Sequence, residues 1–278
     1  MPAPEPFTDI HCHLLPGLDD GPQDLATALA MARLAARDGT RVVIVTPHQL
    51  GRYTSNRGAA IRDQTGLLQQ ALDEHGIPLR LLPGADVRID DRLVALVQQG
   101  EVLSLADHGR HVLVELPHEL YLPLEPLIEQ LAAAGLVAIL SHPERNRGIL
   151  ARPDVVAGLV DAGCLMQVTA GSLTGQFGRS VQGLAEVLIA GGLVQFVGSD
   201  AHATRDRAPV LRPAFDRVAA HTDYQTAIDL LCRNPALVAR GQPVPAGRRR
   251  VPAKTPTWWG WRRHSAADGT LAAASGPR

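Results

Sequence analysis

Short apolar runs alternate with amphipathic stretches along most of the 278-residue chain. The apolar runs are rich in Val, Ile and Leu, which is typical of strands buried on both faces of a parallel sheet. They predict strands at residues 7–11, 42–46, 79–82, 112–116, 136–140, 164–168 and 193–197. Helical spacing of apolar positions predicts helices at residues 23–38, 59–75, 124–134, 153–162, 180–190 and 222–232, with a helix and irregular piece at about 90–105. Strands that alternate with helices in this way indicate an α/β fold with a parallel sheet.

Seven strands in alternation with helices predict a distorted TIM-like (β/α)7 barrel, one strand short of the usual eight. The length suits one such domain, which we place at residues 1–242. An open doubly wound sheet is the alternative architecture. We favour the barrel because no Gly-x-Gly-x-x-Gly turn follows the first predicted strand and the chain contains no P-loop motif.

The composition changes near residue 241 to Pro, Ala, Gly and Arg. We expect residues 243–278 to form a flexible, basic tail, which holds all three tryptophans of the protein. An alternative is that this tail contacts an anionic membrane surface. From residue 247 onward the chain carries seven Lys or Arg and one acid, which leaves 20 basic and 27 acidic residues in the body. An acidic body argues against nucleic-acid binding and suits a protein that gathers carboxylates around cations.

Cysteine and lysine usage narrow the class of protein. Cys12, Cys164 and Cys232 have neither paired nor metal-type spacing, so we expect reduced thiols in a cytoplasmic protein. The N-terminus lacks the pattern of a secretion signal, and no apolar run reaches the length of about 18 residues that a membrane span needs. Lys254, the only lysine, lies in the tail, which excludes barrel enzymes that use a lysine at a strand end.

Histidines and carboxylates fall at, or just after, the ends of the predicted strands. His11 and His13 lie one residue apart on an extended segment, so both rings should point to the same side and Cys12 to the other. The loop that follows carries Asp19 and Asp20. The carboxyl ends of barrel strands meet at one rim, where chemistry is built. The strand-end candidates for one cluster of metal ligands are His11, His13, His48, Asp86, Glu115, His142, Asp200 and His202.

The other six histidines are expected to be solvated or structural. They are His75, His108, His111, His118, His221 and His264.

Imidazole and carboxylate ligands without a thiolate suit Mn, Fe or Zn. The candidates are too many for one ion, so two or three ions are indicated. Clustered divalent ions chiefly serve the hydrolysis of phosphate esters. Arg145 and Arg207 each lie a few residues after a ligand motif, where a guanidinium could bind phosphate oxygens in bidentate fashion. No Cys-x5-Arg loop occurs, which excludes a cysteine-nucleophile phosphatase.

Seven motifs occur along the chain in the order Asp-Ile-His-Cys-His (9–13), Asp-Asp-Gly (19–21), Thr-Pro-His (46–48), Gly-Ala-Asp (84–86), Val-Glu-Leu-Pro (114–117), Ser-His-Pro-Glu-Arg-Asn (141–146) and Ser-Asp-Ala-His (199–202). In this combination the chain resembles the polymerase-and-histidinol-phosphatase (PHP) superfamily over about residues 7–240. Within it, the chain is most similar to the manganese-dependent protein-tyrosine phosphatases of bacterial capsule and exopolysaccharide loci, the CpsB-like type.

This resemblance implies a site with three divalent ions, Mn²⁺ with Fe or Zn as alternatives. One ion would be held by His11, His13 and Asp200, a second by Glu115 and His142, and a third by Asp20, His48 and His202. The bridging glutamate of the family falls at Asp86, whose side chain is one methylene shorter, roughly 1.5 Å of reach. Either the backbone lies closer at Asp86, or one ion is held more loosely. A metal-bound hydroxide would attack phosphorus while Arg145 and Arg207 grip the phosphate oxygens.

The resemblance also implies a substrate and a partner, namely phosphotyrosines on the tail of a membrane-associated bacterial tyrosine kinase that controls polysaccharide export. Arg52, Tyr53 and residues 118–122 are placed to accept such a peptide. The enzyme would then be cytoplasmic and membrane-proximal. Three alternatives stay open: a small-molecule phosphatase of the histidinol-phosphate type, a metal-dependent nuclease, and a regulatory protein without activity.

Overall fold

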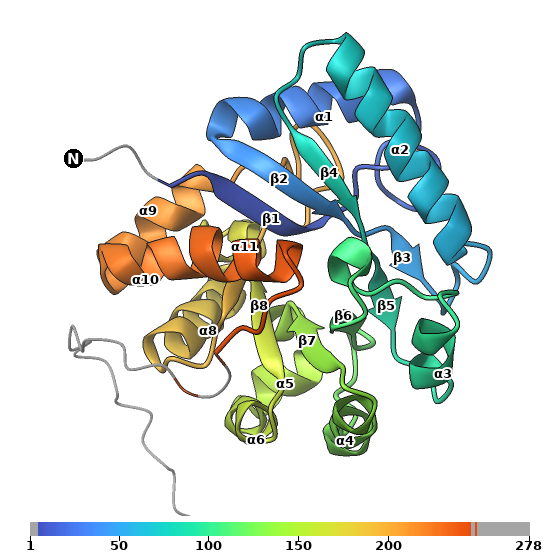
Figure 1. Ribbon diagram of the computed structural model, residues 1–278. Helices are drawn as coiled ribbons and strands as arrows, with labels where there is room; N and C mark the ends of the chain where they lie inside the picture. Colours follow the sequence, from blue (N-terminus) through green and yellow to red (C-terminus); the bar gives the residue numbers. More distant parts are fainter. Residues whose placement is uncertain (1–4, 246–247, 249–278) are drawn as a thin grey trace, which may run out of the picture.

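The computed structural model describes residues 5–245 and 248, in which parallel strands form two sheets (Figure 1). The smaller sheet has the strand order β1-β2-β4 and the larger one β3-β5-β6-β7-β8-β9. Every ladder pair is parallel. The strands are β1 (Phe7–Cys12), β2 (Thr40–Val45), β3 (His48–Gln49), β4 (Arg80–Pro83), β5 (Asp86–Arg88), β6 (His111–Glu115), β7 (Val137–Ser141), β8 (Leu165–Thr169) and β9 (Phe196–Gly198).

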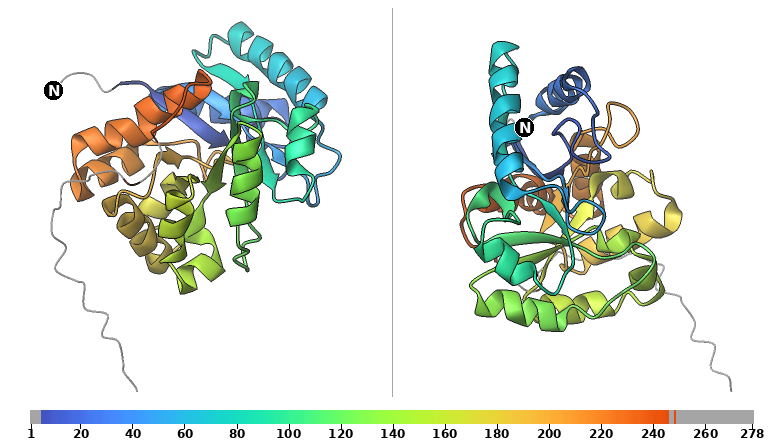
Figure 2. Two further views of the ribbon diagram at one scale, coloured as in Figure 1. Left: turned by 60° about the horizontal axis from the view of Figure 1, so that its bottom comes forward. Right: turned by 90° about the vertical axis from the view of Figure 1, so that its right-hand side faces the viewer.

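Helices follow most strands and cover the outer faces of the two sheets (Figures 1 and 2). The α-helices are α1 (Leu25–Asp38), α2 (Gly58–Glu74), α3 (Leu93–Gln98), α4 (Glu125–Ala133), α5 (Arg147–Ala151), α6 (Val155–Asp161), α7 (Ala170–Leu173), α8 (Arg179–Ala190), α9 (Arg212–His221), α10 (Tyr224–Ile228) and α11 (Asn234–Ala239). Two 3₁₀ helices, η1 (Leu105–Asp107) and η2 (Pro143–Arg145), and a π-helix, η3 (Asp229–Arg233), complete the described elements. The α/β class with parallel strands is therefore confirmed.

Helix α1 shows how local sequence sets an element. The Asp24 carboxylate accepts a hydrogen bond from the Thr27 N–H at 2.7 Å, which satisfies one of the free donors of the first turn. Gly39 ends the helix with φ of 110°, a left-handed conformation that favours glycine. Between these caps, α1 buries a stripe of small and apolar side chains that includes Leu29 and Ala32, and the helix packs against β2.

Both sheets contribute to one small interior core. Its buried members are Ile10 from β1, Ile44 from β2, Leu113 from β6, Ile139 from β7, Leu165 from β8, Phe196 from β9, Leu105 and Ala106 from η1, and Val238 from α11. A second, larger cluster fills the layer between the strands and the surrounding helices. The two sheets thus face a common interior, and helices enclose them from outside.

The predicted closed barrel is observed only in part, because the chain leaves the smaller sheet after two of the predicted strands and continues in the larger one. The strand after α1 breaks at Pro47, which has no N–H to donate, and resumes as β3. The next strand breaks at Gly84, where an added Cβ would lie 2.7 Å from Ile44 Cγ2, and resumes as β5. After each break the chain continues in the larger sheet. In the described residues a single bridge, between Cys12 and Ala201, joins the two sheets, so no continuous ladder closes the barrel.

The helical region after β9 also differs from the prediction. Helix α9 is not predicted by the sequence pattern, and the helix predicted at residues 222–232 is instead the series α10, η3 and α11. The start of α9 is held by Asp38, the last residue of α1, whose Oδ2 accepts from the N–H groups of Leu211 and Arg212 at 2.6 and 3.0 Å. A cap supplied from a distant helix leaves no local signal in the sequence.

The predicted tail, residues 243–278 with its three tryptophans, lies outside the described residues except for 243–245 and 248. In the described part of the chain, every helix is too short or too polar to cross a membrane.

The buried imidazole of His111 gives a testable pH dependence. Burial lowers its pKa to about 4, and Arg110 and His108 add to the effect. The unfolded chain binds a proton near pH 6.5 and the folded chain only near pH 4, so stability contributed by the neutral ring is lost as the pH falls through this window. Between pH 7 and pH 5, the free energy of unfolding should fall about 2 kcal/mol more in the wild type than in His111→Leu. Urea unfolding at both pH values measures this difference.

His75→Leu is the matched control, because His75 is exposed at the end of α2. Equal pH dependence in wild type and His111→Leu would contradict the assignment.

Candidate metal centre

An irregularity in β1 aims the two histidines of the first motif. Asp9 is paired with Val43 and Cys12 with Val45, so an advance of three residues along β1 corresponds to two along β2. Such a bulge re-aims side chains at the end of a strand. Cys12 packs in the outer apolar cluster. The rings of His11 and His13 approach each other, with 3.2 Å between their Nε2 atoms. The predicted same-side placement of the two histidines is therefore observed.

The Asp-Asp-Gly loop holds two of the histidines in place. The Asp19 carboxylate contacts His13 Nδ1 at 2.6 Å and accepts from the backbone N–H groups of His48 and Gly21 at 3.0 Å each. An N–H at Nδ1 of His13 leaves Nε2 as the free electron pair for a metal. Gly21 is required because an added Cβ would lie 2.7 Å from the carbonyl oxygen of His13. Asp19 is thus a positioning residue.

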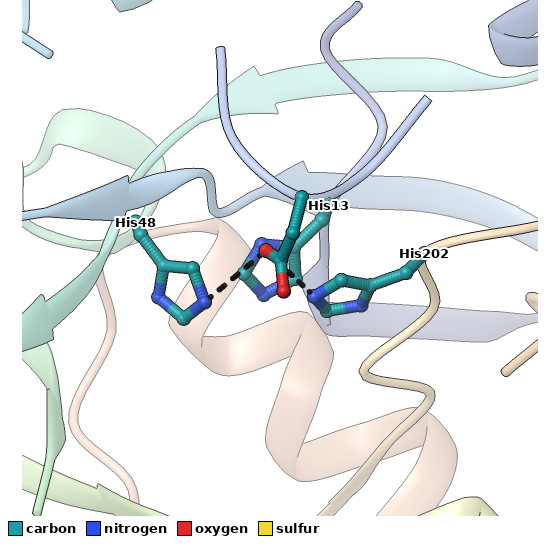
Figure 3. Close-up of side chains that lie close together, drawn as sticks. His13, His48 and His202 are labelled. Carbon is teal, nitrogen blue, oxygen red and sulfur yellow. Dashed lines mark ion pairs between the residues drawn. The ribbon is translucent and has the colours of Figure 1, made fainter. Parts of the chain in front are cut away.

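Asp20, the neighbouring carboxylate, faces a different set of rings. Its Oδ1 lies 3.5 Å from His48 Nε2 and 3.3 Å from His202 Nε2. The side chains of His13, His48 and His202 converge here (Figure 3). The ring centroids of His13 and His202 are 3.9 Å apart, and those of His13 and His48 are 4.5 Å apart. The predicted ligands Asp20, His48 and His202 are therefore brought together, with His13 beside them.

Two more contacts orient the rings of the cluster. His11 Nδ1 lies 2.8 Å from Gln167 Oε1, on β8, so the amide oxygen accepts from this nitrogen. His202 Nδ1 lies 3.0 Å from the carbonyl oxygen of Asp200. In both rings an Nδ1–H leaves Nε2 free toward the centre.

Asp200 joins the first histidine pair to the two predicted arginines. Its Oδ1 lies 3.2 Å from His11 Nε2, 3.6 Å from His13 Nε2 and 2.7 Å from Arg207 Nη2. Arg145 forms an ion pair with its Oδ2. Burial acts to raise the pKa of Asp200, but His11 and the two arginines outweigh it and hold the pKa well below its usual range. Both arginines therefore form ion pairs with the same carboxylate, Asp200, at the rim.

Three residues of this region adopt a backbone conformation that is unusual for non-glycine residues. The φ angles are 33° at His142, 52° at Asp200 and 58° at Arg207. Left-handed backbone costs roughly 1–2 kcal/mol per residue. It is found where a side chain must be aimed at a functional site.

Asp86 is a fully buried carboxylate of the cluster, and among the described residues neither of its oxygens has a hydrogen-bond partner. Its Oδ2 lies 3.6 Å from His11 Nε2 and 3.4 Å from His48 Nδ1. Burial, with the nearby charges of Glu115 and Asp200, raises its pKa well above the usual range. An orphaned carboxylate in this position fits a bound cation.

Glu115 and His142 complete the predicted set at the ends of β6 and β7. Glu115 Oε1 lies 3.6 Å from His142 Nε2. Burial raises the pKa of Glu115 to about 6, and Arg88 opposes the shift from 3.1 Å away.

The described residues could hold metal ions in five overlapping groups, whose donor atoms lie within 4.8 Å of one another in each group. The groups are His13 with Asp20, His48 and His202; His11 with His142 and Asp200; His11 with His13 and Asp86; Glu115 with His118 and His142; and His48 with Asp86 and Glu115. Every predicted ligand belongs to at least one group. Their mixed nitrogen and oxygen donors fit Mn, Fe or Zn.

A cavity of about 180 Å³ opens beside the cluster. It is lined by the predicted substrate-binding residues Arg52 and Tyr53, and the centroid of the Tyr53 ring stacks 5.2 Å from that of His48. Arg88 also lines the cavity and is missed by the sequence analysis. Asp86 and Arg88 share one face of β5 by strand alternation, which was an available signal for Arg88.

His118 lines the same cavity, at the start of the segment 118–122 that was predicted to accept a peptide. The ring, which we expect from the sequence to be solvated or structural, is 45% exposed, and its Nε2 lies 3.6 Å from Glu115 Oε1. The ring therefore lies at the edge of the candidate ligand groups.

Comparisons with known proteins give a consistent result. Residues 7–240 match the family model for capsular polysaccharide synthesis, CpsB/CapC. The chain is 36% identical over 252 residues to the tyrosine-protein phosphatase YwqE of Bacillus subtilis, covering 87% of this chain and 98% of YwqE. It is 23% identical over 240 residues to the tyrosine-protein phosphatase CpsB of Streptococcus pneumoniae, covering 84% and 98%.

A solved structure is similar over the same region. It comes from work on YwqE of Bacillus subtilis and CpsB of Streptococcus pneumoniae, described as metal-dependent tyrosine phosphatases. The TM-score is 0.82 and the identity 33%, over 87% of this chain and 99% of that one.

The role of Asp19 predicts the effect of Asp19→Asn. The variant loses the charged acceptor that orients His13 and fixes the backbone of His48. Metal affinity should fall about 10- to 100-fold, as is typical when a partner of a ligating histidine is removed. Titration of the metal-free protein with Mn²⁺ measures the change. Asp63→Asn, on the exposed face of α2, is the control, and equal affinity in both variants would refute the role.

Proposed function

The chain belongs to the CpsB/CapC family of capsular polysaccharide synthesis, and from this we propose that it is a metal-dependent protein-tyrosine phosphatase. The observation that carries the proposal is the convergence of the predicted histidine and carboxylate ligands on one rim, with an orphaned carboxylate, Asp86, among them. The names of the relatives YwqE and CpsB, both tyrosine-protein phosphatases, support the same activity.

We infer that the two sheets are halves of a distorted (β/α)7 barrel of the PHP type, within a domain of residues 1–242. The interior core shared by both sheets supports this inference. So do the hydrogen bonds from His13 N to the Ala201 oxygen at 2.9 Å and from Asp200 N to the His11 oxygen at 2.7 Å. In such a barrel, β2 with β3 and β4 with β5 each count as one interrupted strand.

We propose that the rim holds three divalent ions, Mn²⁺ with Fe or Zn as alternatives. His11, His13 and Asp200, whose donor atoms lie 3.2 to 3.6 Å apart, would hold one ion. Glu115 and His142 would hold a second, and Asp20, His48 and His202 a third. Asp86 bridges two of them, which its membership of two candidate groups supports. When bound, such ions activate water at neutral pH and neutralise charge on a phosphate.

The residues of the chain bind and orient the phosphate. Arg145, at the end of η2, and Arg207, in the segment after β9, both approach Asp200, so their guanidinium groups flank the point where a phosphate would meet the ions. Planar guanidinium groups match phosphate oxygens in bidentate geometry. The face of the Arg145 guanidinium rests on the Phe177 ring at 4.3 Å, which limits its freedom before the substrate binds.

The cavity beside the cluster would receive the phenyl ring and the flanking peptide. Tyr53 offers an aromatic surface over His48, and Arg52 adds a positive charge at the opening. We propose that the substrate is the phosphotyrosine tail of a membrane-associated bacterial tyrosine kinase that regulates capsule or exopolysaccharide synthesis. The family's role in capsular polysaccharide synthesis supports this partner. Such a substrate puts the enzyme in the cytoplasm near the membrane.

Phosphate release from competing esters tests the activity. We expect Mn²⁺-loaded protein to hydrolyse a phosphotyrosine peptide faster than a phosphoserine peptide or histidinol phosphate. The activity should disappear when the ions are removed by a chelator. It should also disappear in His142→Ala, because His142, with its Nε2 3.6 Å from Glu115 Oε1, is a proposed ligand of the second ion. Phosphate release from histidinol phosphate alone would agree with the proposed metal centre but would refute phosphotyrosine as the substrate. Absence of release from all esters, with metal bound, would refute the phosphatase.

The arginine roles predict a loss of activity without loss of metal. Arg145→Lys and Arg207→Lys should each lower kcat/KM for the phosphotyrosine peptide by about 100-fold, because lysine cannot replace bidentate contacts. Metal content should stay at the wild-type value. Arg147→Lys is the matched control, since Arg147 pairs with the exposed Glu119. Wild-type kinetics in both active-site variants would contradict the proposed phosphate contacts.

A further inference from the structure

We propose that His118 is a third protein ligand of the ion held by Glu115 and His142. The inference rests on the proposed metal centre and adds a ligand to its second ion. His118 follows β6 by three residues and lines the cavity beside the cluster. No role in metal binding follows from the motifs of the sequence.

The distances around Glu115 fit a single ion. His118 Nε2 and His142 Nε2 both lie 3.6 Å from the same oxygen, Glu115 Oε1. The donor atoms of these three residues lie within 4.8 Å of one another. Ligand atoms that are about 2.1 Å from one ion lie roughly 3.0 to 3.6 Å apart when the angle at the ion is about 90° to 120°. Both contacts to Glu115 therefore have the spacing of ligands that share an ion.

In the part of the chain that the structure describes, His118 is the residue that groups with both Glu115 and His142. Asp86 groups with Glu115 and His48, or with His11 and His13, but not with His142. Catalytic metal sites usually have three protein ligands and an open position. His118 therefore completes a set of three protein ligands independently of the bridge proposed for Asp86.

The chain holds His118 against the segment that carries His142. The carbonyl oxygen of His118 accepts from the Arg147 N–H at 2.8 Å. The Asn146 side chain donates to the carbonyl oxygens of Pro117 and Leu120 at 2.7 and 3.0 Å. The rings of His118 and His142 stack with centroids 5.3 Å apart and planes 21° apart. The two imidazoles thus belong to one fixed unit.

Packing around Gly148 strengthens this unit. An added Cβ at Gly148 would lie 2.4 Å from the backbone nitrogen of Tyr121, so the loop after β6 rests directly on the start of α5. This close packing therefore helps to fix the position of the segment that carries His118.

The exposure of His118 places this ligand at the mouth of the site. Its side chain is 45% exposed, whereas the side chains of Glu115 and His142 are 3% and 5% exposed. Together with Arg145 and Phe177, His118 also lines a second cavity of about 330 Å³. The ion that it completes is therefore one that an arriving substrate can reach.

Metal binding tests the proposal directly. Metal-free wild type and His118→Ala are titrated with Mn²⁺, and ion content is measured at each free concentration. We expect the affinity for one ion per chain to fall at least about 10-fold while the other ions bind as in the wild type. In the Co²⁺-loaded protein, loss of one nitrogen ligand should change the visible absorption spectrum. His75→Ala, at the exposed histidine that follows α2, is the matched control.

Two further measurements separate this proposal from its rivals. Added imidazole should restore the lost ion in His118→Gly, because the position is open to solvent. Unchanged affinity and an unchanged Co²⁺ spectrum in His118→Ala, with a raised KM for the phosphotyrosine peptide, would assign His118 to substrate binding and overturn the proposal. Because the titration needs no substrate, its result decides the role of His118 even if the phosphatase proposal fails.

Discussion

Burial of three neighbouring carboxylates is the constraint on which the rest of this site depends. Asp86, Glu115 and Asp200 are at most 2% exposed. An unpaired buried charge costs several kcal/mol. Asp200 is balanced by Arg145 and Arg207, and Glu115 by Arg88. Asp86 has no arginine or lysine ion pair within the described residues. Burial raises its pKa, and the proposed cations would stabilise its charged form.

The fold prepares this cluster before any ligand arrives. The bulge in β1 aims His11 and His13 inward, and Asp19 and Gln167 fix which ring nitrogen faces the centre. Fixed rings lose little freedom when they bind a metal, and their partners raise ligand basicity. Left-handed backbone at His142 and Asp200 is the cost of aiming ligands from the ends of short strands.

The convergence of the candidate ligands was more predictable from the sequence than the arrangement of the sheets was. Strand-end positions bring the ligands together, because parallel strands share one rim. The change from the smaller to the larger sheet after Pro47 and after Gly84 depends on contacts between strands, and the cap of α9 by Asp38 joins two distant helices. The contacts of Asp19 and His118 were hidden for a similar reason, since only the folded chain creates these hydrogen bonds and distances.

Anomalous X-ray diffraction from crystals of the Mn²⁺-loaded protein, recorded on both sides of the manganese absorption edge, tests the proposed metal centre most directly. We expect three manganese peaks at the rim. One should lie within bonding distance of Glu115 and His142, and Asp86 should contact two of the ions. A rim without manganese, or with Asp86 still lacking any cation, would contradict the metal centre and the function built on it.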